Sequence, residues 1–193
     1  MHTNEQQTAL LIMDMQVGIL KNLPDAGPLV ASTFKAISYA RSKNLPVIYV
    51  RVGFRPTLPE VSMNNKSFAT FGQRLSNTSL HVFMQIHEEL TPMQDDIVVD
   101  KRRISAFTGS DLEVILRANN VRHIILAGVS TSGVVLSTTR EAADKDYKIT
   151  ILSDCCADPD DEVHSLLLRK VFPRQADVIT LDEWQKAFST IQA

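Results

Sequence analysis

Short, continuous apolar segments recur along the chain, separated by stretches in which apolar residues have helical spacing. The apolar segments are rich in valine and isoleucine and do not alternate with polar residues. This pattern is typical of strands that are covered on both faces, as in parallel sheets. The segments with this pattern are 8–13, 46–52, 96–99, 123–127, 148–152 and the weaker 177–180.

Helices are predicted between these strands. Alternation of strands with helices favours parallel pairing through right-handed crossovers. We therefore predict a three-layer α/β/α fold of Rossmann-like type with a six-stranded, mostly parallel open sheet, formed by a single domain over residues 1–193. The predicted helices are 28–43, 109–119, 133–146, 160–171 and 181–191.

Residues 53–80 interrupt this alternation, because they are rich in Pro, Asn, Ser and Gly and lack a clear period. A long irregular segment in a compact domain is usually functional or part of an interface. A disordered surface loop is the alternative. Phe68 and Phe71 favour packing of this segment against another part of the protein.

Composition narrows the classes of partner. The formal net charge is -2, which gives no electrostatic reason to expect nucleic acid or a membrane surface as a partner. The stretch MHTNEQQTALLIMDMQ lacks the features of a signal peptide, and its apolar run is too short to span a bilayer.

Cys155 and Cys156 are adjacent, and a disulfide between neighbours is strained. We therefore predict a reduced chain in the cytoplasm.

Polar residues at the carboxyl ends of the predicted strands are the candidate functional groups, because open parallel sheets bind ligands there. Asp14 follows the first strand and Lys101 follows the third. A buried carboxylate beside an ammonium can transfer protons, since each group shifts the other's pKa; a structural ion pair is the alternative. The turn at 128–134 offers backbone N–H groups for an anion, unless Thr131 or Ser132 simply caps the helix.

Further residues at or just after the strand ends are predicted to line a pocket for a small-molecule substrate. Phe54 and Phe107 would supply apolar walls, and Arg51 could hold a substrate carboxylate through two hydrogen bonds. An ion pair of Arg51 with Asp100 or Glu60 is the alternative. The predicted substrate-binding residues are Gln16, Arg51, Phe54, Phe107, Ser130, Thr131, Ser132 and Gly133.

An ordered set of motifs, which covers nearly the whole chain, resembles the isochorismatase-like hydrolase superfamily. The motifs are ALLIMDMQ, DKRRISAF and GVSTSGVVLSTTREAAD. The family pattern is a strand ending in Asp-x-Gln, a Lys followed by Ser-Ala-Phe, a Gly-Val-x-Thr turn, Cys-Val, and a helix with Thr-x-x-x-Ala. Its members are mostly amidases and related C–N hydrolases with an Asp–Lys–Cys triad. The resemblance implies that Asp14 is the acid–base residue and Lys101 its partner.

The resemblance places the nucleophilic cysteine at Val134, which has no nucleophilic atom. Cys155 and Cys156 follow the next strand, where the family does not place its nucleophile, and are predicted to be packing residues. Ser132 is a weak substitute because it lies two positions earlier. Isochorismatases proper also resemble this chain in lacking the cysteine, usually with glycine at that site. They hydrolyse a vinyl ether with the aspartate as general acid.

No metal or other cofactor is predicted. Nicotinamidase-like members of the superfamily bind a metal through an Asp and histidines after the second strand, but VRVGFRPTLPE contains no histidine. The histidines elsewhere in the chain are scattered and do not have the spacing of metal ligands.

The favoured hypothesis is a small-molecule hydrolase that uses Asp14 and Lys101 on a vinyl ether or C–N bond. A catalytically silent protein that binds a small carboxylate or amide is the alternative, favoured by Val134. In a third hypothesis, the active site is completed by a partner chain through residues 53–80. The resemblance also implies a homo-oligomer, a dimer or higher.

Overall fold

The computed structural model describes residues 7–75 and 79–190. Within these residues, six strands form one sheet in the order β3-β2-β1-β4-β5-β6, and every pairing is parallel. The predicted α/β fold with a six-stranded parallel sheet is therefore confirmed. The strands are β1 Thr8–Met13, β2 Val47–Val52, β3 Ile97–Lys101, β4 His123–Val129, β5 Lys148–Ala157 and β6 Asp177–Ile179.

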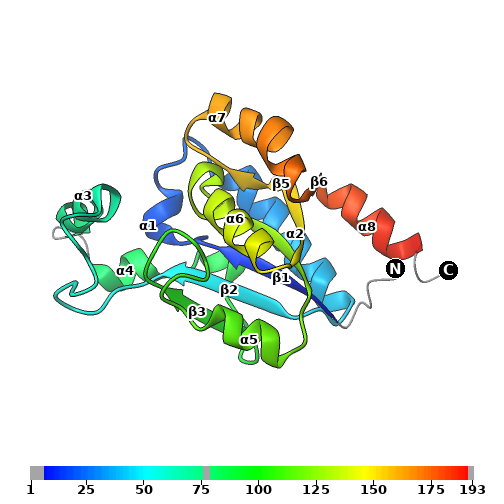
Figure 1. Cartoon of the computed structure of the whole chain (residues 1–193), viewed down its shortest axis with the longest axis horizontal. Helices are drawn as coiled ribbons and strands as arrows, with labels where there is room; N and C mark the ends of the chain where they lie inside the picture. The colour runs from blue at the N-terminus through cyan, green and yellow to red at the C-terminus, as the bar shows by residue number, and fades with distance from the viewer. Residues whose placement is uncertain (1–6, 76–78, 191–193) are drawn as a thin grey trace.

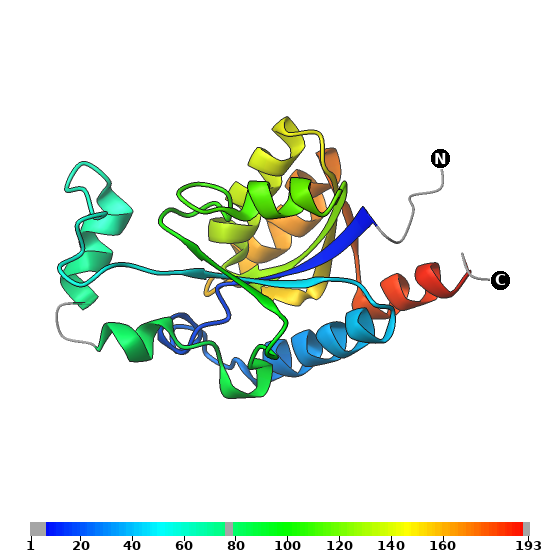
Figure 2. The same ribbon diagram turned by 90° about the horizontal axis from the view of Figure 1, so that it is seen from below.

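Helices cover both faces of this sheet (Figures 1 and 2). Side chains of α5, α6 and η4 join the core on one face, and those of α2 and α8 join the core on the other. The α-helices are α1 Val17–Leu20, α2 Gly27–Ser42, α3 Lys66–Leu75, α4 Leu80–Met84, α5 Leu112–Ala118, α6 Leu136–Asp144, α7 Asp161–Leu166 and α8 Leu181–Thr190. Shorter helical turns are η2 Glu88–Leu90, η3 Thr131–Val135, η4 Leu167–Val171 and η5 Phe172–Arg174.

The central strand β1 shows why its sequence is continuously apolar. All of its residues are buried, because successive side chains of a strand point to opposite faces. Leu11 and Met13 belong to the core under α5 and α6, whereas Leu10 and Ile12 belong to the core under α2 and α8. Both faces of the strand therefore need apolar side chains.

β5 differs from its predicted bounds, which ended at 152. It continues to Ala157 and contains both cysteines, so the prediction that they follow this strand was wrong. The pairing with β4 is irregular: Leu126 pairs with Ile151, but Gly128 pairs with Cys156. The extra residues of β5 form a bulge, after which the hydrogen-bonded ladder resumes.

The segment 53–80 contains α3 and the start of α4, and Figure 2 shows α3 beyond the carboxyl end of β2. Phe68 of α3 is buried and packs edge-on against Phe54, with ring centroids 5.9 Å apart. The side chain of Phe71 lies outside the described residues. The described part of this segment is therefore packed, and the disordered-loop alternative does not hold for it.

The strand order reverses between β1 and β4, which are neighbours in the sheet. Open α/β sheets bind ligands in the crevice outside the carboxyl ends of the strands at such a point. β4 comes close to β1 here because Gly128 has no side chain: a Cβ at this position would lie 2.6 Å from the carbonyl oxygen of Met13. The residue after β1 and the turn after β4 are thus held side by side.

At the opposite end of the sheet, His123 makes stability depend on pH. It is buried, with Nε2 2.8 Å from the Thr150 Oγ1 and Nδ1 3.4 Å from the Thr8 Oγ1. Burial, helped by the charge of Lys148, lowers the pKa of His123 from 6.5 to about 4. Below pH ~6.5 the unfolded chain binds a proton that the folded protein does not bind until pH ~4. The free energy of unfolding therefore decreases by up to about 3 kcal/mol as the pH falls from ~6.5 to ~4.

Urea unfolding of the wild type and of His123→Gln between pH 4 and 8 measures this effect. We expect the wild type to lose more stability than the variant as the pH falls from ~6.5 to ~4. Parallel stability curves for the two proteins would contradict the assignment to His123.

Candidate active site

Asp14 and Lys101 meet at the carboxyl edge of the sheet. Asp14 directly follows β1 and has a φ of 58°, in the left-handed region. Lys101 ends β3 and reaches past β2, so that its Nζ lies 2.9 Å from the Asp14 Oδ2. Only 6% of Asp14 and 2% of Lys101 are exposed. The structure therefore brings together, in a buried ion pair, the two residues that the sequence analysis singled out.

The Lys101 ammonium has an acceptor for each of its three N–H groups. Besides Asp14, it donates hydrogen bonds to the backbone carbonyls of Arg103 and Ile104, both at 3.0 Å. These carbonyls lie in the loop after β3. The ammonium is thus fixed in place and has no further proton to offer to a substrate anion.

The second carboxyl oxygen of Asp14 is differently placed. Within the described residues Oδ1 is buried and has no hydrogen-bond partner. Burial raises the pKa of Asp14 above its ordinary value, and the charge and hydrogen bond of Lys101 together with the nearby Val52 N–H oppose this rise. A carboxyl group with a raised pKa and an unpartnered oxygen can present a proton to a ligand.

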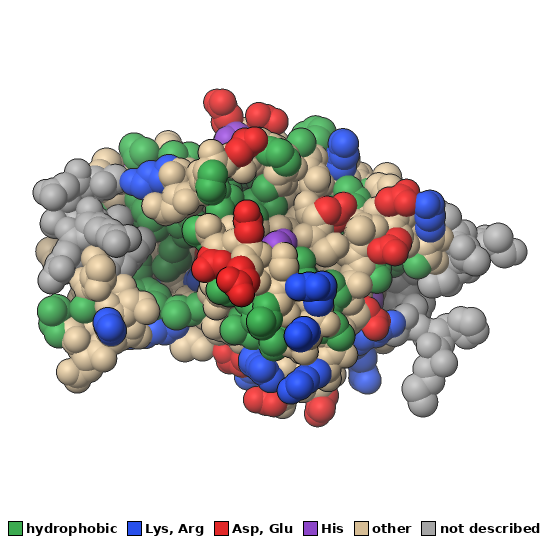
Figure 3. Space-filling model, turned by 90° about the horizontal axis from the view of Figure 1, so that it is seen from above, with side chains coloured by type: hydrophobic (Ala, Val, Ile, Leu, Met, Phe, Trp, Pro, Cys, Tyr) green, Lys and Arg blue, Asp and Glu red, His purple; other side chains and the backbone are tan. Residues whose placement is uncertain are grey.

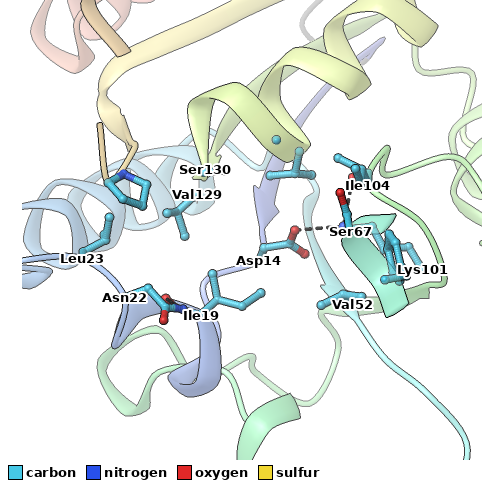
Figure 4. Close-up of a pocket in the computed structure, with 14 residues that line it drawn as sticks. Asp14, Ile19, Asn22, Leu23, Val52, Ser67, Lys101, Ile104, Val129 and Ser130 are labelled. Atoms are coloured by element: carbon cyan, nitrogen blue, oxygen red, sulfur yellow. Dashed lines mark hydrogen bonds and ion pairs between the residues drawn. The ribbon is translucent and has the colours of Figure 1, made fainter. Parts of the chain in front are cut away.

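A cavity of about 320 Å³ lies against this carboxyl group (Figure 4). Most of its lining comes from three segments: α1 with the loop that follows, the start of α3, and the end of β4 with the turn after it. Figure 3 shows this end of the molecule as a hollow with hydrophobic side chains gathered on its walls. The apolar side chains of the lining are Ile19, Leu23, Val52, Phe68, Ile104, Val129, Val134 and Pro159, and the polar ones besides the ion pair are Asn22, Ser67 and Ser130.

The turn after β4 contributes Ser130, Gly133 and Val134 to the cavity. The Val129–Ser130 peptide bond is cis. Two N–H groups of the turn already have partners inside the protein: Ser132 donates to the Asp158 carboxylate at 2.7 Å and Gly133 donates to the Ser130 carbonyl at 3.1 Å. These two N–H groups are therefore not free to bind an anion, so the predicted anion-binding wall has two donors fewer.

The helical cap predicted as the alternative for this turn was wrong. Ser130, rather than Thr131 or Ser132, precedes the helical turn, and its side chain makes no capping hydrogen bond. Thr131 is fully buried, and its Oγ1 lies 2.8 Å from the Nδ1 of His164, whereas Ser132 is exposed. Neither side chain lines the cavity.

Two further predicted substrate-binding residues hold the sheet edge instead of lining the cavity. The side-chain amide of Gln16 accepts a hydrogen bond from the Val52 N–H at 2.7 Å and donates to the Val52 carbonyl at 3.0 Å. The Arg51 Nε lies 2.5 Å from the Asp100 Oδ1, which is the ion pair considered as the alternative. Arg51 and the cavity-lining Val52 are neighbours in β2, so their side chains lie on opposite faces of the strand.

Neither of the two predicted aromatic walls lines the cavity. Phe54 packs against Phe68, which itself lines the cavity. Phe107 stacks on Tyr147 in the core under α5 and α6, with ring centroids 5.8 Å apart. Of the predicted substrate-binding residues, Ser130 and Gly133 are the ones that line the cavity.

Sequence reasoning missed most of the lining side chains. Ile19, Asn22 and Leu23 come from α1 and the loop after it, and no motif marked them. Ser67 and Phe68 come from α3, and the one available signal was the break in pattern over residues 53–80. Because α1 follows β1 closely, Ile19 could have been expected near this edge of the sheet, but the direction of its side chain could not have been predicted.

Both cysteines lie away from the cavity, buried in β5. Cys155 joins the core under α2 and Cys156 joins the core under α6. Burial raises the pKa of Cys156 to about 12 and also raises that of Cys155, so both stay thiols at neutral pH. Their environment is that of packing residues.

Residues 7–75 and 79–190 contain no group of three or more His, Cys, Asp or Glu side chains arranged to hold a metal ion. In the same part of the chain, no helix is long and apolar enough to cross a membrane.

Comparisons with known proteins agree with this architecture. The chain matches the isochorismatase domain over residues 8–183. It is 32% identical to a probable isochorismatase of Pseudomonas chlororaphis (92% of this chain, 84% of the relative) and 28% identical to the ureidoacrylate amidohydrolase RutB of Pseudomonas syringae (77% and 69%). An isochorismatase family protein from Burkholderia thailandensis superposes with a TM-score of 0.85 at 28% identity, covering 97% of this chain and 98% of that one. The chain belongs to the isochorismatase family, within the isochorismatase-like hydrolase superfamily.

Proposed function

We propose that the protein is a small-molecule hydrolase in which Asp14 and Lys101 carry out acid–base chemistry without a cysteine nucleophile. The observation that carries this proposal is the asymmetry of the Asp14 carboxyl group. One oxygen is held by Lys101 at 2.9 Å, and the other is buried, unpartnered within the described residues, and adjacent to the cavity. A structural ion pair alone gives no reason for the unpartnered oxygen, since buried polar atoms normally have partners.

The chemistry needs only a proton donor and water. In its acid form Asp14 gives a proton to the substrate, and the oxygen of a water molecule bonds to the electrophilic carbon as the scissile C–O or C–N bond breaks. One proton of that water restores the acid form of Asp14. The Lys101 ammonium stabilises the carboxylate that exists between the two transfers.

Val134 supports a route without a covalent intermediate. It lines the cavity on the turn where relatives with a cysteine would carry the nucleophile, and a valine cannot attack a substrate. Neither Cys155 nor Cys156 lines this cavity. Hydrolysis of a vinyl ether or of a C–N bond by direct attack of water fits this arrangement.

The lining favours an uncharged, largely apolar substrate. Lys101 is the one cationic side chain among the described lining residues, and its N–H groups are all engaged. Arg51, the predicted carboxylate anchor, pairs with Asp100 outside the cavity. A substrate carboxylate would therefore enter an apolar cavity without a free cation, which is costly.

A panel of aryl vinyl ethers and aryl amides, each in an uncharged and a para-carboxylate form, tests this substrate class. We expect the protein to hydrolyse the uncharged members of one series with kcat/KM values about tenfold or more above those of the corresponding carboxylates. A tenfold ratio corresponds to a difference of ~1.4 kcal/mol in activation free energy. Leu23→Arg places a cation on the lining and should narrow that ratio. A wild-type preference for the carboxylates would overturn the assignment.

Val134 also favours a second function, the binding of a small ligand without turnover, because its side chain fills space at the catalytic turn of the family. Calorimetry with the same panel separates the two functions. Unchanged ligand affinity in Asp14→Asn, with no product from any compound, would establish the binding protein in place of the hydrolase.

Assembly and location belong to the same proposal. We expect a single-domain chain that forms a dimer or a higher homo-oligomer in the cytoplasm and needs no cofactor. The free, buried cysteines support a reduced compartment. Light scattering at high protein concentration tests the assembly, and a monomer would contradict it.

A further inference from the structure

The position of Lys101 depends on a loop without regular structure. Two of its three hydrogen-bond acceptors are the carbonyls of Arg103 and Ile104, which follow the last residue of β3. The hydrogen bonds of the sheet end with this strand. The carbonyls are held by contacts on either side of them: before them the Arg102 guanidinium donates to the Gly53 carbonyl at 3.0 Å, and after them the loop contacts α6.

The loop is fastened to α6 by three hydrogen bonds. The N–H of Ala106 donates to the Thr138 Oγ1 at 2.9 Å, between two fully buried residues. The hydroxyls of Ser105 and Thr108 both donate to the Glu141 Oε2, at 2.6 and 3.0 Å. Two side chains on one helix thus hold the loop immediately after the carbonyls that bind Lys101.

The same helix continues from the turn that carries Val134. The cavity wall at Val134 and the anchor of the loop around Lys101 therefore belong to one continuous helical segment, η3 followed by α6. The other charged groups at this contact lie on the outer side: the Lys145 Nζ is 3.9 Å from the Glu141 Oε1 and 2.6 Å from the Glu113 Oε2.

We propose that Thr138 and Glu141 are positioning residues: by fixing the loop over 105–108, they hold the two carbonyls that place the Lys101 ammonium against Asp14. Neither side chain lines the cavity or touches the ion pair directly. The proposal goes beyond hydrolysis, because it holds equally for a protein that only binds its ligand.

Thr138 and Thr139 form a matched pair for testing this role. They are adjacent in α6 and both are fully buried. Thr138 accepts the Ala106 N–H, whereas the Thr139 hydroxyl has no hydrogen-bond partner within the described residues. Replacement by valine keeps the size of either side chain, but only Thr138→Val leaves a buried N–H of the loop without its acceptor.

The test is an NMR titration of the Asp14 carboxyl carbon, assigned through Asp14→Asn, in wild type, Thr138→Val, Thr138→Ser and Thr139→Val. A less firmly held ammonium stabilises the Asp14 carboxylate less, so Thr138→Val should raise the titration midpoint by about half a pH unit or more. Thr138→Ser should restore the wild-type midpoint, and Thr139→Val should not move it. A wild-type midpoint in Thr138→Val, or an equal rise in Thr139→Val, overturns the proposal.

Glu141→Ala repeats the test at a half-buried helical position, where alanine is well tolerated. Glu113→Ala is its control, because it removes a carboxylate beside Lys145 without touching the loop. We expect the Asp14 midpoint to rise in Glu141→Ala only; a rise in both variants, or in neither, overturns the role of Glu141. Since the titration needs no substrate, its outcome is independent of whether the protein is a hydrolase.

Discussion

Asp14→Asn is expected to lower kcat/KM by about 10²–10⁴-fold on any compound that the wild type hydrolyses. Asparagine matches the aspartate in size and tolerates the left-handed backbone at this position, where φ is 58°. It cannot, however, give a proton to a substrate and recover it from water. The loss should therefore appear in turnover with little change in the folded structure.

Steady-state kinetics and thermal unfolding of Asp14→Asn measure the two effects separately. Asp100→Asn is the matched control, because this carboxylate also lies at the edge of the sheet but pairs with Arg51 outside the cavity. We expect Asp100→Asn to retain near-wild-type kcat/KM. Comparable activity in Asp14→Asn and the wild type would remove Asp14 from the mechanism.

Lys101→Met is expected to destabilise the protein by about 3–5 kcal/mol at neutral pH, because it leaves a buried carboxyl group without its cation. The carbonyls of Arg103 and Ile104 lose their donor as well. Burial already raises the pKa of Asp14, and without the Lys101 charge that opposes this rise, the pKa increases further. The folded variant then holds a proton that the unfolded chain releases above pH ~4, so its stability falls as the pH rises from ~4 through the raised pKa.

Denaturant unfolding between pH 4 and 8 measures this slope. Lys145→Met is the control, since Lys145 is partly exposed and pairs with Glu113 at the surface. We expect Lys145→Met to lose little stability, and we expect its stability not to fall as the pH rises. The double variant Asp14→Asn/Lys101→Met should lack this fall and keep only the pH dependence of His123, which runs in the opposite direction. A Lys101→Met protein with wild-type stability at all pH values would contradict the account of the buried pair.

The chain pattern alone predicted the parallel sheet and the meeting of Asp14 with Lys101, for a definite physical reason. Continuous apolar strands such as Thr8–Met13 must be covered on both faces, and the carboxyl ends of parallel strands converge on one edge. A residue that directly follows such a strand has few positions open to it. The pair could therefore be identified before any side chain was placed.

The direction of individual side chains could not be predicted in the same way. Arg51 and Val52 are neighbours in β2, and a shift of one residue decides which of them faces the cavity. Ile19 and Phe68 come from helices whose placement depends on tertiary packing rather than on local pattern. The bulge that draws Cys156 into β5 likewise follows from pairing with Gly128, a partner distant in sequence.

The proposed hydrolysis through Asp14 forms no covalent intermediate, and rapid-quench intact-protein mass spectrometry during turnover tests this. The measurement uses the wild type with the best-hydrolysed compound of the panel, and Asp14→Asn beside it. We expect product formation by the wild type with an unmodified protein mass at every quench time, and almost no product from Asp14→Asn. A transient mass increase that maps to Cys155 or Cys156, or to any other side chain, would contradict it.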